Sequence, residues 1–257
     1  MNRVEGKAAL ITGGGAGIGA ATGELVCAEG GMAVLVDANA DALAVTMQAI
    51  AQRVPGARVS TFAADVADAG AAARAVEHAL QTFGKLDILV NNAAMRNYSA
   101  IADSTPAEWQ AMVGVNLIGA ANYCKVALPA LRRSGRASIV NVSSCYALTG
   151  RKGMGLYDAT KAGILALTRT LAFEEVAHGV RVNAVCPGST LTDFHISKAR
   201  SAGKSVETLK TERQTTSLLG RWAAPQEIAW PILWLASDEA SFITGATLAV
   251  DGGLSIM

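Results

Sequence analysis

The chain has 257 residues, of which 51% are hydrophobic and 17% are charged, and its formal net charge is +1. This composition excludes extended disorder, and it lacks the basic surplus that nucleic-acid-binding proteins usually carry. No apolar run approaches the ~18–20 residues that a membrane span needs, and glycine interrupts the N-terminal region before a signal-peptide core could form. We therefore expect a cytoplasmic protein without a nucleic-acid or membrane partner.

Short apolar runs alternate with longer, alanine-rich runs along the chain. The short runs are almost continuously apolar, which is typical of parallel strands that are covered on both faces. The expected strands are 8–12, 32–37, 58–65, 87–93, 138–144, 180–185 and 247–251. The expected helices are 18–29, 41–53, 69–83, 107–133 and 156–178. Strand–helix alternation predicts an α/β fold with a doubly wound, seven-stranded parallel sheet, in a single domain over residues 1–257.

The segment 189–219 interrupts this alternation. It is polar and rich in lysine, and it contains no strand signal. Long insertions in compact domains are usually functional or mobile, and loop residues bind ligands disproportionately often. We expect this segment to form a lid over a binding site.

The first expected strand runs into the glycine-rich stretch TGGGAGIG (12–19), and a helix follows. Glycines let the backbone approach a ligand closely, and the helix N-terminus offers N–H groups and a positive dipole end to a pyrophosphate. Gly15, Gly17 and Ala20 fit the pattern G-x-G-x-x-G/A in the strand–turn–helix context that it requires. We predict a dinucleotide site here. The expected contacts in this loop are Gly13, Gly15, Gly17, Ile18 and Gly19.

Asp37 ends the second expected strand, 20 residues after Gly17. A carboxylate at this place can accept hydrogen bonds from the ribose hydroxyls and repels a 2′-phosphate, and neither Ala16 nor Ala38 supplies a cation that could bind such a phosphate. The sequence therefore favours NAD over NADP. Asp65, at the end of the third expected strand and followed by Val66, could contact the adenine or cap the next helix.

The stretch YDATK places Tyr157 four residues before Lys161. Residues i and i+4 share one face of a helix, so both side chains can act on one ligand. A free tyrosine titrates near pH ~10, and a neighbouring cation favours the phenolate, which makes the pair a candidate for proton transfer. Ser143 and Ser144 end the preceding strand, where ligands of parallel sheets bind, and only one of them can face the site.

These elements together resemble the single-domain branch of the short-chain dehydrogenase/reductase family, whose members have about 250 residues, and the resemblance covers essentially the whole chain. The family's pattern T-G-x-x-x-G-x-G is met at 12–19, its N-N-A-G element appears as NNAA (91–94) with alanine in place of the last glycine, and its Y-x-x-x-K falls on 157–161. Its P-G turn and its V-D-G-G element fall on 187–188 and 250–253.

The resemblance implies hydride transfer between a nicotinamide and a secondary alcohol or ketone. The implied catalytic residues are Asn116, Ser144, Tyr157 and Lys161, where Ser144 is chosen over Ser143 because the family's serine lies 13 residues before its tyrosine. Tyr157 would be the acid/base, Ser144 would bind the substrate oxygen, and Asn116 would position a proton-relay water. The implied further cofactor contacts are Asn92, Ala93, Pro187, Gly188, Thr190 and Thr192, together with Tyr157 and Lys161.

The C-terminal stretch 221–253 carries three tryptophans, which we place on an apolar helix that precedes the final strand. Large apolar patches often mark subunit contacts, and the family resemblance implies a homotetramer. Neither the four cysteines nor the three histidines have metal-ligand spacing, so we expect no metal site. We treat the histidines as structural or surface residues, with a reservation for His195.

Two other functions remain open at this point. A 3-oxoacyl carrier-protein reductase is a frequent role for sequences of this type but usually requires NADPH, and a dinucleotide sensor would bind the cofactor without turnover. The substrate is not named by the sequence. Arg96 and Arg151 flank the expected pocket and suit a carboxylate, so an anionic substrate is a hypothesis, and a solvated charged rim is its alternative.

Overall fold

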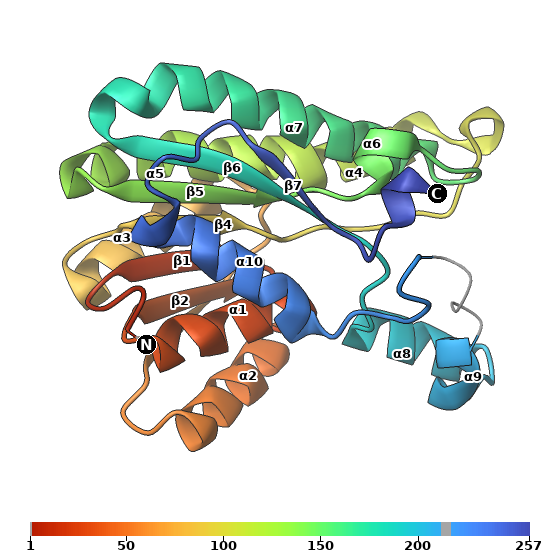
Figure 1. Cartoon of the computed structure of the whole chain (residues 1–257), viewed down its shortest axis with the longest axis horizontal. Coiled ribbons are helices and arrows are strands. Elements are labelled where there is room, and N and C mark those ends of the chain that lie inside the picture. The colour runs from red at the N-terminus through yellow and green to blue at the C-terminus, as the bar shows by residue number, and fades with distance from the viewer. Residues whose placement is uncertain (1, 212–216) are drawn as a thin grey trace.

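The computed structural model describes residues 2–211 and 217–257. Within these ranges one parallel sheet has the strand order β3-β2-β1-β4-β5-β6-β7 (Figure 1). The strands are β1 (Ala8–Thr12), β2 (Met32–Asp37), β3 (Arg58–Ala63), β4 (Ile88–Asn91), β5 (Ala137–Val142), β6 (Val180–Pro187) and β7 (Thr247–Val250). The predicted doubly wound, seven-stranded α/β sheet is confirmed.

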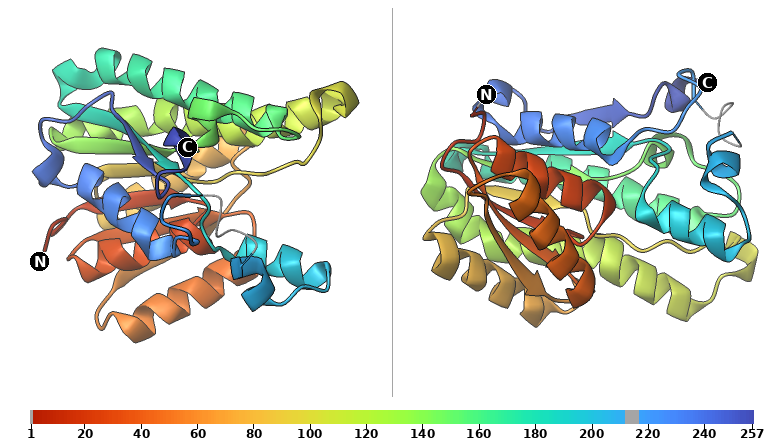
Figure 2. Two further views of the ribbon diagram at one scale, coloured as in Figure 1. Left: turned by 45° about the vertical axis from the view of Figure 1, so that its right-hand side comes forward. Right: turned by 90° about the horizontal axis from the view of Figure 1, so that it is seen from below.

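Helices cover both faces of the sheet, as the two views in Figure 2 show. The α-helices are α1 (Gly17–Ala28), α2 (Ala40–Arg53), α3 (Ala69–Phe83), α4 (Pro106–Val113), α5 (Ala120–Ser134), α6 (Tyr146–Thr149), α7 (Gly155–Glu175), α8 (Asp193–Ser201), α9 (Val206–Thr211) and α10 (Pro225–Ala236). A π-helical turn, η2 (Gly114–Gly119), joins α4 to α5, and the 3₁₀ turns are η1 (Ile101–Asp103), η3 (Val176–His178), η4 (Asp238–Ala240) and η5 (Leu254–Ile256).

Alternate residues of each central strand point into two separate cores. Leu10 of β1 packs in the core beneath α3 and α5, whereas its neighbours Ala9 and Ile11 pack in the core beneath α1 and α10. This follows from the two-residue period of a strand, and because both faces are covered, the strand must be apolar throughout. The continuous apolar runs of the sequence therefore have a direct structural cause.

The helix expected at 107–133 is interrupted by η2, which the sequence pattern did not reveal. The combined helical segment Pro106–Ser134 is long and apolar enough to cross a membrane by length and composition, although polar residues interrupt every apolar run within it. Its apolar side chains Tyr123, Ala127 and Leu131 are fully buried in the core shared with α3. Core helices of globular proteins pass the same test.

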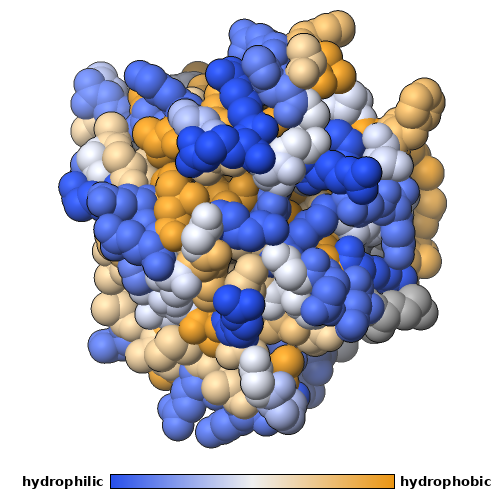
Figure 3. All heavy atoms as spheres, turned by 90° about the vertical axis from the view of Figure 1, so that its left-hand side faces the viewer, coloured by the Kyte–Doolittle hydropathy of each residue, from blue (hydrophilic) through white to orange (hydrophobic). Residues whose placement is uncertain are grey.

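The carboxyl ends of all the strands face the side of the molecule that carries α8 and α9 (Figure 1). The opposite side, at the amino ends of the strands, is a mosaic of hydrophilic and hydrophobic side chains (Figure 3). The C-terminal turn η5 lies against α6 at the carboxyl-end side. Loops from several strands therefore meet at one edge of the sheet, where ligands of parallel sheets bind.

Candidate active site

A cavity of about 520 Å³ opens at the carboxyl ends of the strands. Its wall combines the loop after β1, the ends of β2, β4, β5 and β6, the start of α7, and α8. We call the part around residues 13–18 and Asp37 the glycine end, and the part around Arg96, Ser144, Tyr157 and Lys161 the tyrosine end. The strands β1 and β4 lie between β2 and β5, which separates the two ends.

The loop of the glycine end has a backbone that side chains would obstruct. Gly13 and Gly17 have φ angles of +67° and +55°, in the left-handed region that favours glycine. A Cβ atom on Gly19 would overlap the carbonyl oxygen of Gly13 and would stand 2.7 Å from Nδ2 of Asn92. The N-cap residue of α1, Ala16, supplies no side-chain cap, and Ala16, Gly17 and Ile18 line the cavity. The N-terminus of α1 therefore lies where its N–H groups suit a pyrophosphate.

Buried hydrogen bonds hold this loop against β4. The Thr12 hydroxyl accepts from the backbone N–H groups of Asn92 and Ala93, at 3.0 and 3.1 Å. Nδ2 of Asn92 donates to the carbonyl oxygens of Thr12 and Gly13, at 3.0 and 3.1 Å. Asn92 and Ala93 both line the cavity. Asn92 therefore sets the shape of the glycine loop, in addition to any contact with a ligand.

Asp37 stands at the end of β2 and lines the glycine end. Its Oδ2 accepts from the N–H of Gly15 at 3.0 Å, and its Oδ1 accepts from the N–H of Asn39 at 3.0 Å. These bonds fix the carboxylate beside the loop. Asp65 is exposed and accepts from the N–H of Ala67 at 2.9 Å, whereas the N-cap of α3 is Asp68, so Asp65 does not cap that helix. Neither Asp65 nor the buried Val66 is part of the cavity wall.

The residues after β6 close the glycine end from the other side. The wall includes Pro187, Gly188, Thr190 and Thr192. The Thr190 hydroxyl donates to the carbonyl of Gly188 at 3.2 Å. Asp193 in the first turn of α8 accepts from the N–H of Gly17 at 3.3 Å. The start of the 189–219 segment thus lies directly on the glycine loop.

Ser144, Tyr157 and Lys161 meet at the tyrosine end. The neighbouring Ser143 uses its hydroxyl to donate to the carbonyl of Lys161 at 2.7 Å, whereas the Ser144 hydroxyl accepts from the N–H of Tyr146 at 3.2 Å and keeps its own proton for another acceptor. Among the described residues, the Tyr157 hydroxyl has no hydrogen-bond partner in the structure. It is therefore available to a ligand.

The Lys161 ammonium is buried, with 2% of the residue exposed, and donates to the carbonyl of Val142 at 2.8 Å. Burial, and to a smaller extent the positive charge of Arg96, lower the pKa of Lys161 to about 7. The amine thus titrates near neutral pH. A buried amine of this kind beside a phenol is typical of proton-transfer sites.

Asn116 lies in the π-helical turn η2 and is 1% exposed. Its Oδ1 accepts from the N–H of Met95 at 2.8 Å, and its Nδ2 donates to the Met95 carbonyl at 3.1 Å and to the Thr160 hydroxyl at 3.1 Å. Asn116 is not part of the cavity wall. Through these bonds Asn116 ties the loop after β4 to α7. This positions Arg96, which follows Met95 in the chain.

Both arginines lie over the Tyr157 ring, but their polar partners differ. Arg151 pairs with Asp158, with 3.3 Å between Nη2 and Oδ1, and its guanidinium stacks on the Tyr146 ring at 3.9 Å. Burial raises the pKa of Asp158, and the Arg151 charge opposes that effect. Arg96 instead donates to Nε2 of His195 at 3.0 Å and lies over the Tyr157 ring, with 5.1 Å between its Cζ and the ring centroid.

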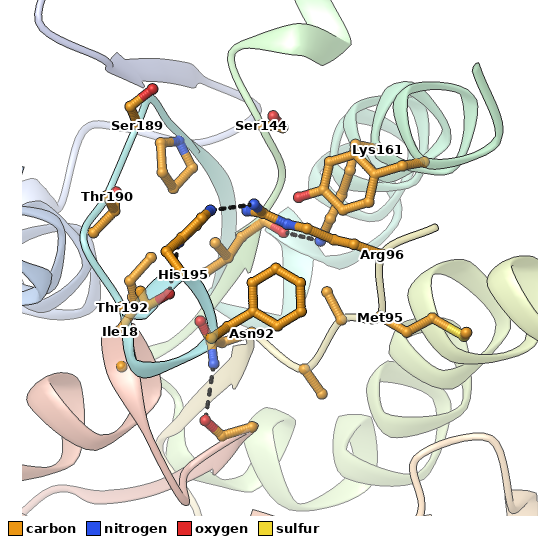
Figure 4. Close-up of a pocket in the computed structure, with 18 of the residues that line it drawn as sticks. Ile18, Asn92, Met95, Arg96, Ser144, Lys161, Ser189, Thr190, Thr192 and His195 are labelled. Atoms are coloured by element: carbon orange, nitrogen blue, oxygen red, sulfur yellow. Dashed lines mark hydrogen bonds between the residues drawn. The ribbon is translucent and has the colours of Figure 1, made fainter. Parts of the chain in front are cut away.

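Sequence reasoning did not place His195 or Trp222 in this wall. His195 on α8 faces Arg96 across the cavity (Figure 4). Trp222 was expected on the apolar helix, but it precedes α10, is 7% exposed, and packs against the His195 ring with centroids 5.0 Å apart. Pro225 was an available signal, because proline favours the first helical position and so places Trp222 before the helix.

Among the residues that the structure describes, no group of three or more histidine, cysteine, aspartate and glutamate side chains could hold a metal ion. All four cysteines are buried and free. Burial raises the pKa of Cys27 and of Cys145 to about 11, so these thiols are poor nucleophiles.

A family model described as "Enoyl-(Acyl carrier protein) reductase" matches residues 13–255. A relative from Aspergillus oryzae named short chain dehydrogenase/reductase astE is 39% identical over 256 residues, which cover 99% of this chain and 97% of the relative. The chain belongs to the short-chain dehydrogenase/reductase family. It is an oxidoreductase of that family, and its matches include both dehydrogenases and reductases.

Two further short-chain dehydrogenase/reductase relatives bear on the cofactor and the substrate. The 3-oxoacyl-[acyl-carrier-protein] reductase FabG of Thermotoga maritima is 36% identical over 258 residues, which cover 99% of this chain and 100% of the relative. The solved structure of L-sorbose reductase from Gluconobacter frateurii, complexed with NADPH and L-sorbose, is 30% identical, with a TM-score of 0.94 and full coverage of both chains. The fold is thus shared with enzymes of different specificity.

Proposed function

We propose that this short-chain dehydrogenase/reductase is an NAD-dependent enzyme that interconverts a secondary alcohol and its ketone, with Tyr157 as the acid/base. The observation that supports this most strongly is the tyrosine end itself, where a phenol without a partner among the described residues stands beside a buried amine and a serine hydroxyl. A cytoplasmic location is part of the same proposal.

In alcohol oxidation the proton and the hydride leave the substrate separately. The Ser144 hydroxyl donates a hydrogen bond to the substrate oxygen and holds that oxygen beside the hydroxyl oxygen of Tyr157. The Lys161 ammonium stabilises the Tyr157 phenolate, which takes the hydroxyl proton and becomes the neutral phenol. The bound nicotinamide supplies the hydride acceptor. Ketone reduction reverses these roles, so that Tyr157 donates the proton.

The preference for NAD rests on the charges at the glycine end. Asp37 is held beside the loop by two backbone N–H groups. The cationic side chains among the described wall residues are Arg96, Arg151 and Lys161, whose contacts are all at the tyrosine end. A ribose 2′-phosphate at Asp37 would meet a carboxylate without a compensating cation. The sorbose reductase structure contains NADPH, which is a finding about that protein and does not set the cofactor of this chain.

The second candidate is a 3-oxoacyl carrier-protein reductase that uses NADPH, favoured by the similarity to FabG of T. maritima. It needs the same Tyr157 chemistry, so the cofactor distinguishes the two. We also propose that residues 189–219 act as a lid, because Asp193 contacts the glycine loop and His195 contacts Arg96. Residues 212–216 of this segment lie outside the described part of the chain.

The test follows absorbance at the reduced-nicotinamide band with NAD⁺ and NADP⁺ against a panel of secondary alcohols. We expect turnover with NAD⁺, and a loss of about 10³-fold or more in kcat on Tyr157→Phe, with cofactor binding kept. Turnover with NADP⁺ alone would contradict the reading of Asp37 and support the acyl reductase. Unchanged turnover in the Tyr157→Phe variant would remove Tyr157 from the mechanism.

We further propose a homotetramer. The edge strand β7 has exposed residues at Thr247 and Ala249, and Phe242 between α10 and β7 is fully exposed. An open strand edge beside an exposed aromatic ring is a surface that proteins usually cover. Light scattering of the purified protein measures the assembly directly, and a monomer at micromolar concentration would contradict it.

A further inference from the structure

The tyrosine end holds one arginine whose charge no carboxylate of the described residues neutralises. We propose that this residue, Arg96, anchors a carboxylate carried by the substrate, so that the enzyme acts on a hydroxy acid or keto acid. The inference rests on the proposed alcohol–ketone chemistry and adds the substrate class. The structure also assigns different roles to the two arginines, because Arg151 is already committed to Asp158.

The backbone immediately before Arg96 is held in place. Asn116 binds the N–H and the carbonyl of Met95 from the buried turn η2. The guanidinium then extends into the cavity between α8 and the Tyr157 ring, as Figure 4 shows for Arg96 and His195. An anchor needs such support, because a group that moves by an ångström orients a substrate poorly. Arg96 is thus placed for binding and is not a solvated surface side chain.

The hydrogen bonds of His195 set the orientation of the Arg96 guanidinium. Arginine has only donors, so Nε2 of His195 must be the acceptor, and the ring proton lies on Nδ1, where it donates to the Thr192 hydroxyl. This bond uses one of the five N–H donors of Arg96. The remaining donors can bind a carboxylate through two parallel hydrogen bonds, which is the geometry that arginine favours.

The charges around Arg96 point to an anion. The buried Lys161 adds a second cation when protonated, and its lowered pKa reflects in part the charge of Arg96. The acidic residues that line the cavity are Asp37 and Asp193, and both bind N–H groups of the glycine loop. A carboxylate on Arg96 would offset its charge and so favour the protonated Lys161 that stabilises the phenolate. Anion binding and proton transfer are therefore coupled.

The position of Arg96 also limits the size of the substrate. Its Cζ lies 5.1 Å from the centroid of the Tyr157 ring. The reacting hydroxyl must reach the Tyr157 phenol and Ser144, while the carboxylate reaches the guanidinium over the same ring. Both groups therefore belong to one small molecule. A compact or cyclic hydroxy acid meets this requirement better than a long acyl chain with a distant charge.

Calorimetry on a catalytically inactive background tests the anchor without turnover. The protein is Tyr157→Phe saturated with NAD⁺, and the probes are 3-hydroxybutyrate, mandelate and 4-hydroxycyclohexanecarboxylate, each paired with its uncharged primary amide. We expect at least one acid to bind about 10-fold or more tightly than its amide. Adding Arg96→Met should reduce that acid-to-amide ratio about 10- to 100-fold, as for the loss of a charge-assisted pair.

Three further variants separate anchoring from other effects. Arg200→Met removes an exposed arginine from α8, the helix that carries His195. This variant should leave the acid-to-amide ratio unchanged. Arg96→Lys should recover only part of it, since lysine keeps the charge without the planar pair of donors. His195→Phe removes the hydrogen bond that orients the Arg96 guanidinium but keeps the arginine, so it should lower the acid-to-amide ratio less than Arg96→Met does.

An equal loss for acid and amide on Arg96→Met would overturn the proposal and leave Arg96 as a contact that holds α8 in place. The absence of any acid preference before Arg96 is changed would also overturn it. Both results are independent of the proposed oxidoreduction, which fails separately if the unmodified enzyme turns over none of the alcohols with either cofactor.

Discussion

The two ends of the cavity are built on different principles. The glycine end is made of main chain, shaped by glycines and held by neutral buried hydrogen bonds from Thr12 and Asn92. The tyrosine end is made of side chains from β4, β5, α7 and α8, and it includes a buried amine and two arginines. The first end is stable because its polar groups are satisfied, whereas the second keeps charges in place at a cost in folding free energy.

The largest expected effect concerns Lys161. Lys161→Met should abolish turnover and yet stabilise the apo protein at pH 6, by at most about 4 kcal/mol in the free energy of unfolding. The gain comes from removing a charge that is costly to bury, reduced by the lost hydrogen bond to Val142. Urea denaturation at pH 6 measures the difference. If Lys161→Met were less stable than the unmodified protein at pH 6, the buried ammonium would not lower the free energy of unfolding.

The pH dependence of this difference has a definite sign. The folded pKa of Lys161, about 7, lies below the ordinary value of 10.5. Below pH 7 both states hold the proton, so the whole cost of the buried charge is present. Between pH 7 and 10.5 the folded state has released the proton that the unfolded state keeps, and the stability of the unmodified protein rises. The advantage of Lys161→Met should therefore shrink from pH 7 towards pH 10.

The next largest effect breaks the glycine end by adding one methyl group. In Gly19→Ala the new Cβ would overlap the Gly13 carbonyl oxygen, so α1 must move away from the loop. We expect a loss of about 3 kcal/mol in stability, together with loss of cofactor binding. Thermal unfolding with and without NADH measures both.

Gly114→Ala is the matched control for Gly19→Ala. A Cβ added to Gly114 would lie 4.0 Å from the Cβ of Ala67, which is its nearest neighbour. The φ angle of Gly114 is in the helical region. Replacing a helical glycine with alanine should then be neutral or stabilising, by about 0.5–1 kcal/mol. Equal losses in the two variants would mean that the packing of α1 on the glycine loop is not special.

A smaller effect tests the buried hydrogen bonds of the same end. Thr12→Val keeps the shape of the side chain but leaves the N–H groups of Asn92 and Ala93 without their acceptor. We expect a loss of about 2 kcal/mol in stability and weaker NADH binding. Thr12→Ser keeps the acceptor and should lose only about 0.8 kcal/mol, for one buried methyl group. Equal losses in Thr12→Val and Thr12→Ser would contradict a role for the hydroxyl.

The amino-acid sequence by itself determined the sheet, the glycine loop and the Tyr157–Lys161 pair. These features depend on residues that are close in the chain: continuous apolar runs set the strands, and the i,i+4 spacing on α7 places the phenol and the amine on one helix face. The same local character explains why Ser144 could be placed at the end of β5. The serine choice itself needed the family spacing, since a strand end alone does not say which of two residues faces a ligand.

Only the tertiary structure decided which charges and rings meet. Arg96 and His195 are 99 residues apart in the chain and form a hydrogen bond. Arg151 forms a salt bridge with Asp158, whereas Arg96 forms none with a carboxylate of the described residues. Trp222 lies before α10, in the cavity wall, and not on the helix where the sequence had placed it. The π-helical turn η2 brings Asn116 into contact with Met95. Side-chain pairing between loops depends on distances across the fold, and the spacing of residues along the chain carries no record of those distances.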